Sequence, residues 1–266
     1  MTRMTKLKFV TAILLALVVS ACATGGPRQP PAGTTEPDKF LFDRGNENLQ
    51  RKRWLYAREY FRQLVDSYPT SRYRADAKLG IGDSYLGEKS AESYVLGINE
   101  YREFLNFYPT HERAHYAQYQ LAMAYFNQMR SSMRDQTETR DAIRELQTYI
   151  ARYADKPLIN DARQKLREAK DRLADWDVGV AVHYFRIRWY PGVVGPLEPL
   201  LKADPDYTRR DAVFYYLGES YFKAQRPAEA LPYFERLVKE FEQSEHLEEA
   251  QKRIAEIKAA NPAIAK

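Results

Sequence analysis

Apolar residues recur every three to four positions from Lys39 to about Lys258. This spacing predicts amphipathic helices, and the alternating apolar and polar runs that are typical of strands are missing. A short pattern also recurs five times with variation: Gly or Ala, Tyr three residues later, then Ala and Phe four residues apart. The best copies contain Gly45, Ala57 and Phe61 or Gly218, Tyr221, Ala230 and Phe234. The sequence therefore predicts an all-α superhelical stack of about five tetratricopeptide-like helix pairs.

Each residue type in this pattern has a packing reason. The small residue lets two antiparallel helices cross closely, and the aromatic residue fills the gap between neighbouring pairs. Proline ends the second helix, as at Pro69 and Pro109. The other copies place Gly82, Ala122 and Ala181 at the small position, and a long helix from Asn160 to about Arg186 is expected in the fourth copy.

The first 21 residues carry the features of an export signal. Arg3, Lys6 and Lys8 precede an apolar run from Phe9 to Val19, which is too short to span a bilayer as a helix of roughly 20 residues. Without these three cations the chain has 38 basic and 36 acidic residues, a net charge of +2. Such a balanced charge gives no support for nucleic-acid binding.

Cys22 is the only cysteine of the chain, so it cannot form an internal disulfide. The segment Val-Ser-Ala-Cys resembles the bacterial lipobox, and this resemblance implies cleavage before Cys22 and a covalent lipid on that residue. A plain secretory signal beside a stray cysteine is the alternative. Ala23 follows where lipoproteins retained in the inner membrane often have Asp, which favours the outer membrane.

The predicted organisation has five parts. Residues 1–21 form the removed signal, and residues 22–38 form the lipidated cysteine with a Pro- and Gly-rich tether. Residues 39–155 hold repeats 1–3 with a substrate groove, residues 156–258 hold the long helix with repeats 4 and 5 for partner docking, and residues 259–266 form a frayed tail. The groove is apolar and aromatic, which suggests an extended hydrophobic peptide as ligand, although Leu79, Leu86 and Phe126 could equally be core residues.

One motif could indicate an enzyme. His111, Glu112 and His115 match H-E-x-x-H, which on a helix binds zinc beside a glutamate base. Arg113 stands inside the motif and would repel zinc, and no third ligand is evident. The expected role is structural, with Thr110 capping the helix and Glu112 meeting the helix dipole. No other catalytic motif is present, so we expect no enzyme activity and no cofactor besides the lipid.

The whole chain resembles the BamD family, the lipoproteins of the outer-membrane β-barrel assembly machine. The resemblance rests on the lipobox and tether, on the segments Tyr68–Tyr73 and Tyr108–His111, and on the long-helix segment Lys170–Phe185. It implies a periplasm-facing subunit anchored to the outer membrane. Its partners would be unfolded outer-membrane proteins, the barrel-forming subunit BamA and other assembly lipoproteins.

The resemblance also implies two surfaces. The predicted substrate residues are Phe42, Asn46, Tyr68, Tyr73, Tyr116 and Tyr119. The predicted partner-docking residues are Arg186, Arg188, Trp189 and Tyr190. A pilotin for a secretin pore, or a coordinator of cell-wall enzymes, remains the alternative function.

Overall fold

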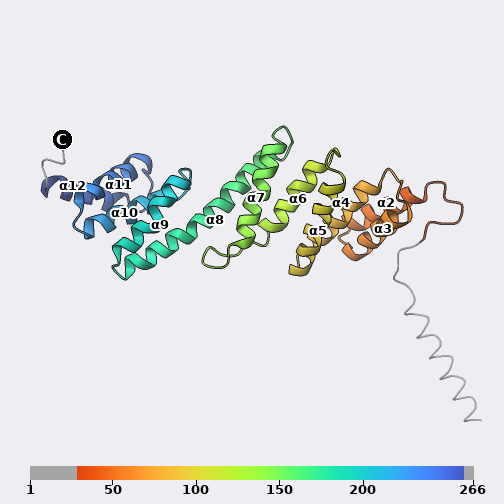
Figure 1. Cartoon of the computed structure of the whole chain (residues 1–266), viewed down its shortest axis with the longest axis horizontal. Coiled ribbons are helices and arrows are strands. Elements are labelled where there is room, and N and C mark those ends of the chain that lie inside the picture. Colours follow the sequence, from red (N-terminus) through yellow and green to blue (C-terminus); the bar gives the residue numbers. More distant parts are fainter. Residues whose placement is uncertain (1–28, 261–266) are drawn as a thin grey trace, which may run out of the picture. The chain divides into compact units, whose positions relative to one another are not determined.

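The structure, a computed structural model, describes residues 29–260. The regular structure of this range is α-helical throughout, without strands (Figure 1). The helices are α2 (Pro37–Gln50), α3 (Trp54–Ser67), α4 (Arg74–Glu88), α5 (Ala91–Phe107), α6 (Ala114–Phe126), α7 (Thr137–Arg152), α8 (Ile159–Arg186), α9 (Tyr190–Ala203), α10 (Arg210–Lys223), α11 (Pro227–Glu240) and α12 (Leu247–Ala260). Between Gln29 and Ala260, no helix has a stretch long and apolar enough to cross a bilayer.

The helices form five consecutive pairs, α2–α3, α4–α5, α6–α7, α8–α9 and α10–α11, followed by α12. This arrangement confirms the predicted all-α stack of tetratricopeptide-like pairs. The long helix of the fourth pair is confirmed within one residue of its predicted start. The helices α3 and α5 end directly before Tyr68-Pro69 and Tyr108-Pro109, as predicted. Two outer bounds differ slightly, since α2 begins at Pro37 and α12 continues to Ala260.

The chain folds as two compact units that meet between Pro109 and Thr110 in the sequence. Unit 1 contains the pairs α2–α3 and α4–α5, and unit 2 contains the other three pairs and α12. Each unit is described by itself. The division after residue 155, which separates predicted roles, stays a prediction. The predicted signal, Cys22 and the first part of the tether lie outside the described residues, as does most of the predicted tail.

The core of unit 1 is built around Phe61 of α3, which is fully buried. A Cβ atom on Gly45 of α2 would lie 2.4 Å from one side of the Phe61 ring, and a Cβ on Gly80 of α4 would lie 2.4 Å from the other. Because only glycine leaves room at these points, the ring joins its own pair to the next pair. The predicted close crossing at Gly45 and the predicted position of Phe61 between neighbouring pairs are both confirmed.

Unit 2 repeats the same packing. Phe234 of α11 is fully buried against α10, where a Cβ on Gly218 would lie 2.7 Å from the Phe234 ring. The last helix, α12, adds the buried residues Ala250 and Ile257 to this core. An ion pair between Arg253 of α12 and the buried Glu219 of α10 also holds α12 in place.

We expect Phe234→Ala to lower the free energy of unfolding of unit 2 by about 3 to 5 kcal/mol, because the truncation leaves a cavity beside Gly218. Denaturant melts followed by circular dichroism measure this loss. The control is Ile187→Ala, since Ile187 is 58% exposed and its truncation should cost less than about 0.5 kcal/mol. Equal effects of the two variants would contradict the packing of Phe234 described here.

Candidate functional site

The six predicted substrate residues are divided between the two units. Phe42, Asn46, Tyr68 and Tyr73 belong to unit 1, whereas Tyr116 and Tyr119 belong to α6 in unit 2. The first four lie in unit 1, where Phe42, Tyr68 and Tyr73 pack on one core and Asn46 is one turn from Phe42; these four are defined here as the N-terminal face. The other two form a separate group.

The N-terminal face centres on a stacked aromatic pair. The rings of Phe42 and Tyr73 are parallel within 17°, with centroids 5.0 Å apart. The guanidinium of Arg72 lies 4.8 Å from the Tyr73 ring centroid and donates a 2.6 Å hydrogen bond to the Tyr73 hydroxyl. Phe42, Tyr73 and Tyr68 are half-buried and pack on the core that contains Phe61. These rings therefore support the fold and also present part of their surface to solvent.

A hydroxyl anchors the turn that carries Tyr73. The Oγ–H of Ser71 donates to a carboxylate oxygen of Asp38 at 2.6 Å, and Ser71 Oγ accepts the Tyr73 backbone N–H at 3.1 Å. The hydrogen bond from Ser71 holds the pKa of the Asp38 carboxyl below its usual value. The turn between α3 and α4 is thus tied to the start of α2.

The same arrangement occurs in the fifth pair. Ser244 donates to Asp211 at 2.7 Å, Ser244 Oγ accepts the backbone N–H of His246 at 3.2 Å, and the His246 ring stacks on Tyr215 at 4.2 Å. Tyr215 precedes Gly218 by three residues, just as Phe42 precedes Gly45. The stack of Phe42 on Tyr73 is therefore a feature of the repeat as well as a predicted ligand contact.

Asn46 differs from its aromatic neighbours. It is half-buried on α2, one turn from Phe42, and its side-chain amide makes no hydrogen bond within residues 29–260. An amide offers both a donor and an acceptor, which are the groups that pair with the backbone of an extended peptide. The Asn46 amide is therefore available to a ligand, as is the Tyr68 hydroxyl, whereas the Tyr73 hydroxyl is bonded to Arg72.

Tyr119 has an internal role in unit 2. Its hydroxyl donates to Asp161 of α8, and its ring meets the buried Tyr149 edge-on at 5.6 Å. Burial, followed by the hydrogen bond to Asp161, raises the pKa of the Tyr119 phenol. Tyr116 lies on the same helix with the Arg113 guanidinium 4.7 Å from its ring centroid. The Tyr119 hydroxyl therefore already has a hydrogen-bond partner within the fold.

For three further residues of the predicted groove, the sequence allows either a ligand contact or a core position. Leu79 is fully buried in unit 1, so the core interpretation is confirmed for it. Leu86 is half-buried and its side chain occupies the space that a Cβ on Gly97 would need. Phe126 is half-buried against the core formed by α6, α7 and α8, beneath the ammonium of Lys165 at 4.7 Å.

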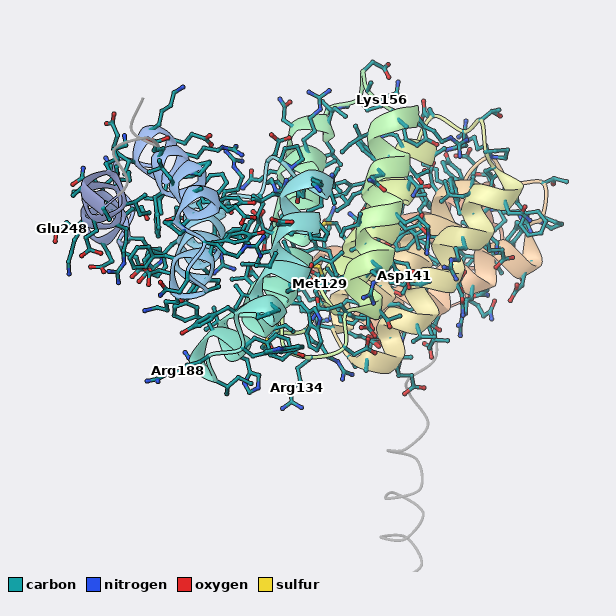
Figure 2. All side chains as sticks on the ribbon, turned by 60° about the vertical axis from the view of Figure 1, so that its left-hand side comes forward. Met129, Arg134, Asp141, Lys156, Arg188 and Glu248 are labelled. Carbon is teal, nitrogen blue, oxygen red and sulfur yellow. The ribbon has the colours of Figure 1, made fainter. Side chains whose placement is uncertain are left out.

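The four predicted partner-docking residues lie together at the turn between α8 and α9. Arg188 has a left-handed backbone, φ 62°, and reverses the chain there. Arg186, Arg188 and Tyr190 line a groove of about 590 Å³ together with Phe185, Phe222, Lys223 and Gln225. Trp189 lies beside this groove, 52% exposed, with its ring edge-on to Tyr184 at 4.6 Å. Figure 2 shows Arg188 projecting from the end of α8.

The groove at this turn is cationic. Its lining contains Arg186, Arg188 and Lys223 and includes no acidic residue. Within the described range, neither arginine has an ion-pair partner, whereas Lys223 pairs with Glu219 at 3.2 Å.

The sequence prediction missed Lys223, although it follows Gly218 by five residues just as Arg186 follows Ala181. The repeat register could have identified it.

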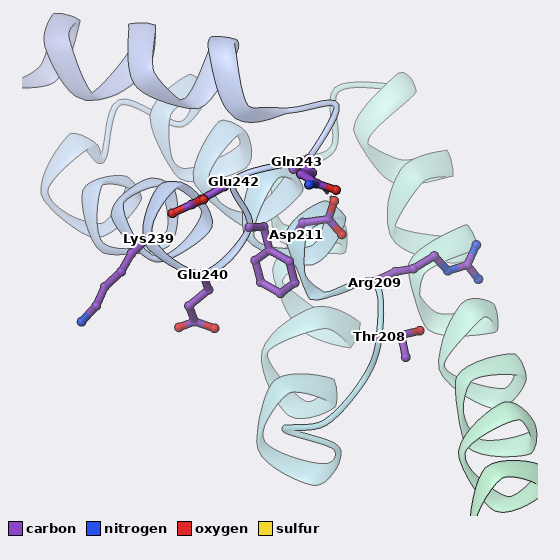
Figure 3. A pocket seen from close by; sticks show the side chains of 9 residues that line it. Thr208, Arg209, Asp211, Lys239, Glu240, Glu242 and Gln243 are labelled. Atoms are coloured by element: carbon purple, nitrogen blue, oxygen red, sulfur yellow. Dashed lines mark hydrogen bonds between the residues drawn. The ribbon is translucent and has the colours of Figure 1, made fainter.

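A second hollow, of about 620 Å³, lies between the α9–α10 and α11–α12 turns (Figure 3). Thr208 and Arg209 border it on one side, and Lys239, Glu240 and Glu242 border it on the other. Because its lining mixes acidic and basic side chains, this hollow is typical of an ordinary junction between repeats and not of a ligand site.

The H-E-x-x-H segment does not form the helical geometry that zinc binding needs. His111 lies in the turn before α6, and α6 begins only at Ala114, so the two histidines are not on one helix. The prediction that Thr110 caps this helix was wrong, because the N-cap residue is Arg113 and no side chain caps it. Instead, His111 Nδ1 accepts the Arg113 N–H at 3.2 Å. Residues 29–260 contain no group of three or more metal-ligating side chains.

A family model described as outer membrane lipoprotein, YfiO, matches residues 34–230. The chain is 26% identical over 213 residues to the outer membrane protein assembly factor BamD of Caulobacter vibrioides, covering 80% of this chain and 68% of that protein. It is 24% identical over 203 residues to the protein of the same name from Vibrio cholerae, covering 73% and 83%. Among solved structures, the yeast Sti1 TPR2AB domain in its pHSP90 complex gives a TM-score of 0.46 at 11% identity, with 84% of this chain and 83% of that chain covered.

We expect Tyr119→Phe to lower the free energy of unfolding by about 1.5 to 3 kcal/mol at pH 7, because it removes a hydrogen bond to a carboxylate. The raised pKa of Tyr119 means that its contribution is complete below pH of about 10 and is lost as the pH rises through the folded-state pKa. The difference between variant and wild type should therefore shrink at alkaline pH. Denaturant melts across this pH range measure it.

The matched control is Tyr184→Phe in the same unit, because the Tyr184 hydroxyl makes no hydrogen bond within the described residues. This variant should leave stability nearly unchanged at every pH. If the free energy of unfolding of Tyr119→Phe stayed below that of the wild type by a constant amount up to high pH, the assigned hydrogen bond would be contradicted.

Proposed function

Because the chain belongs to the YfiO family of outer membrane lipoproteins, we propose that it is a non-catalytic scaffold for assembly of outer-membrane β-barrel proteins. Its relatives named outer membrane protein assembly factor BamD support this assignment. A lipid on Cys22 would hold the protein to the outer membrane, facing the periplasm. The fold supplies two separate binding surfaces, and neither requires a covalent step.

The N-terminal face receives segments of unfolded outer-membrane proteins. The observation that carries this proposal is the available amide of Asn46 beside the half-buried rings of Phe42 and Tyr73. Aromatic side chains of an extended segment would pack on the rings, and its backbone would pair with the amide. In unit 2, Tyr116 and the exposed part of Tyr119 would offer a separate set of aromatic contacts.

The turn between α8 and α9 docks the barrel-forming subunit BamA. Its exposed Ile187 and Trp189 supply apolar contact area, and Arg186 and Arg188 supply unpaired positive charge. Trp and Arg are enriched among the residues that dominate protein interfaces. The complementary surface of the partner would be apolar with an acidic rim.

We expect Asn46→Ala and Phe42→Ala each to weaken binding of an outer-membrane protein segment at least tenfold, or about 1.4 kcal/mol. The probe is a fluorescent synthetic peptide with the C-terminal strand sequence of a barrel protein, ending in Phe, and the measurement is fluorescence anisotropy. Phe107→Ala is the control, since Phe107 is 64% exposed in the same unit but outside the N-terminal face. Circular dichroism verifies that each variant is folded. If Asn46→Ala bound the peptide with unchanged affinity, the peptide site would have to lie elsewhere on the protein.

Arg188→Glu should weaken binding to the periplasmic domains of the barrel subunit at least tenfold and make that binding less sensitive to salt, because a charge facing an acidic partner is reversed. Lys202→Glu, at an exposed position of α9, makes the same change in net charge and should have little effect. Surface plasmon resonance at several salt concentrations measures both. Binding to a secretin domain with no binding to the barrel subunit would favour the pilotin alternative.

A further inference from the structure

One end of unit 1 carries exposed apolar side chains that neither proposed surface uses. Leu55 and Tyr56 in the first turn of α3 are 57% and 42% exposed, and Val95 and Leu96 near the start of α5 are 54% and 37% exposed. Lys52, Arg53 and Lys89 occupy the adjoining turns and are exposed as well. These seven residues are defined here as the tip surface.

The two halves of the tip surface adjoin the same helix end. Trp54 packs so closely on the last turn of α4 that a Cβ on Gly87 would lie 2.8 Å from its indole. Leu86, one residue earlier, occupies the space that a Cβ on Gly97 of α5 would need, at 2.8 Å. The starts of α3 and α5 therefore both pack on the end of α4, and the exposed residues beside them lie around that end.

Positive charge dominates the tip surface. Within residues 29–260, Lys52, Arg53 and Lys89 have no ion-pair partner. The neighbouring Arg51 is paired with Glu47 at 2.9 Å. Among the nearby acidic side chains, Glu88 is bound to Arg58 at 2.7 Å, and Glu47, which Arg53 also approaches, is bound to Arg51. Glu59 and the exposed Glu92 are the remaining opposing charges.

We propose that the tip surface docks on the surface of a bilayer that contains anionic phospholipids. Apolar side chains beside unpaired Lys and Arg match such a surface, because the apolar groups enter the boundary of the acyl chains while the cations meet lipid phosphates. Tyr56 adds an amphipathic ring of the kind that is enriched at membrane interfaces. This inference rests on the proposed function insofar as a lipid on Cys22 would bring the same bilayer close.

The position of the tether is compatible with this docking. Gln29, the first described residue, accepts a 2.7 Å hydrogen bond from Gln63 of α3. Gln63 lies nine residues after Trp54, about 14 Å along the helix at 1.5 Å per residue. Six residues lie between Cys22 and Gln29, and the seven Cα–Cα steps that join the two can span up to about 25 Å. A lipid on Cys22 and the tip surface can therefore reach one bilayer together.

The test uses the chain from Ala23 onward, which keeps every described residue but carries no lipid and no cysteine. We expect it to sediment at least tenfold more with vesicles of phosphatidylcholine and phosphatidylglycerol than with vesicles of phosphatidylcholine alone. The triple variant Lys52→Glu, Arg53→Glu, Lys89→Glu should lose this preference. The control triple variant Arg163→Glu, Lys202→Glu, Lys239→Glu makes the same charge change at exposed positions of unit 2 and should keep it.

A fluorescent label locates the contact. An environment-sensitive dye on Leu55→Cys should shift to shorter wavelength with the anionic vesicles, whereas the same dye on Asp66→Cys, exposed at the other end of α3, should not. No binding, equal loss in both triple variants, or equal shifts at both dye positions would overturn the proposal. The outcome is independent of the lipid, because fractionation of a full-length Cys22→Ala variant tests the anchor separately.

Discussion

The fold depends on one repeated contact, in which an aromatic ring on the second helix of a pair lies against a residue without a side chain on the first. In unit 1, the Phe61 ring fills the space between Gly45 and Gly80, so a methyl group on either glycine would collide with it. The same ring therefore closes one pair and fixes its distance to the next. Phe234 and Gly218 repeat the contact in unit 2. Because the Phe61 ring is shared between two pairs, the first pair has no complete core of its own.

This sharing also decides which residues are available to a ligand. The aromatic residue three positions before the small residue belongs to the stack: Phe42 contacts Tyr73, and Tyr215 contacts His246. Tyr119 occupies the same register and is held by Asp161. Within each unit these side chains are held in place by the fold, so their contact with a ligand would cost little conformational entropy. Asn46 lies one position after the small residue, where the packing of the repeat does not require a particular side chain. Residues at such positions are therefore the ones that can recognise polar groups of a ligand.

The sequence alone was sufficient to predict the features that arise from local periodicity. Helix pairs, the long α8 and the crossing of Gly45 with Phe61 depend on spacing within short segments, and spacing is visible in the sequence. Contacts between distant side chains were not visible: Asp38 and Ser71 are 33 residues apart, and their hydrogen bond depends on how two pairs pack. The cap of α6 was misplaced for a related reason, since the turn before the helix makes its own hydrogen bonds: His111 Nδ1 accepts the Arg113 N–H, and the His111 carbonyl accepts the Ala114 N–H. Lys223 was missed only because the repeat register was not extended to the ends of the first helices.

The same register explains why the chain can be nearly neutral overall and still carry concentrated positive charge. Many charged side chains on helix faces are paired along or between helices, such as Arg51 with Glu47 and Arg58 with Glu88. The tight turn within a pair lies beyond these faces, and its single left-handed residue is Lys52, Lys89 or Arg188 in three of the pairs. In all three pairs this long cation is exposed and forms no ion pair within residues 29–260. Within each unit, anionic partners can therefore bind at the turns while apolar segments bind on helix faces, so the two kinds of ligand need not compete.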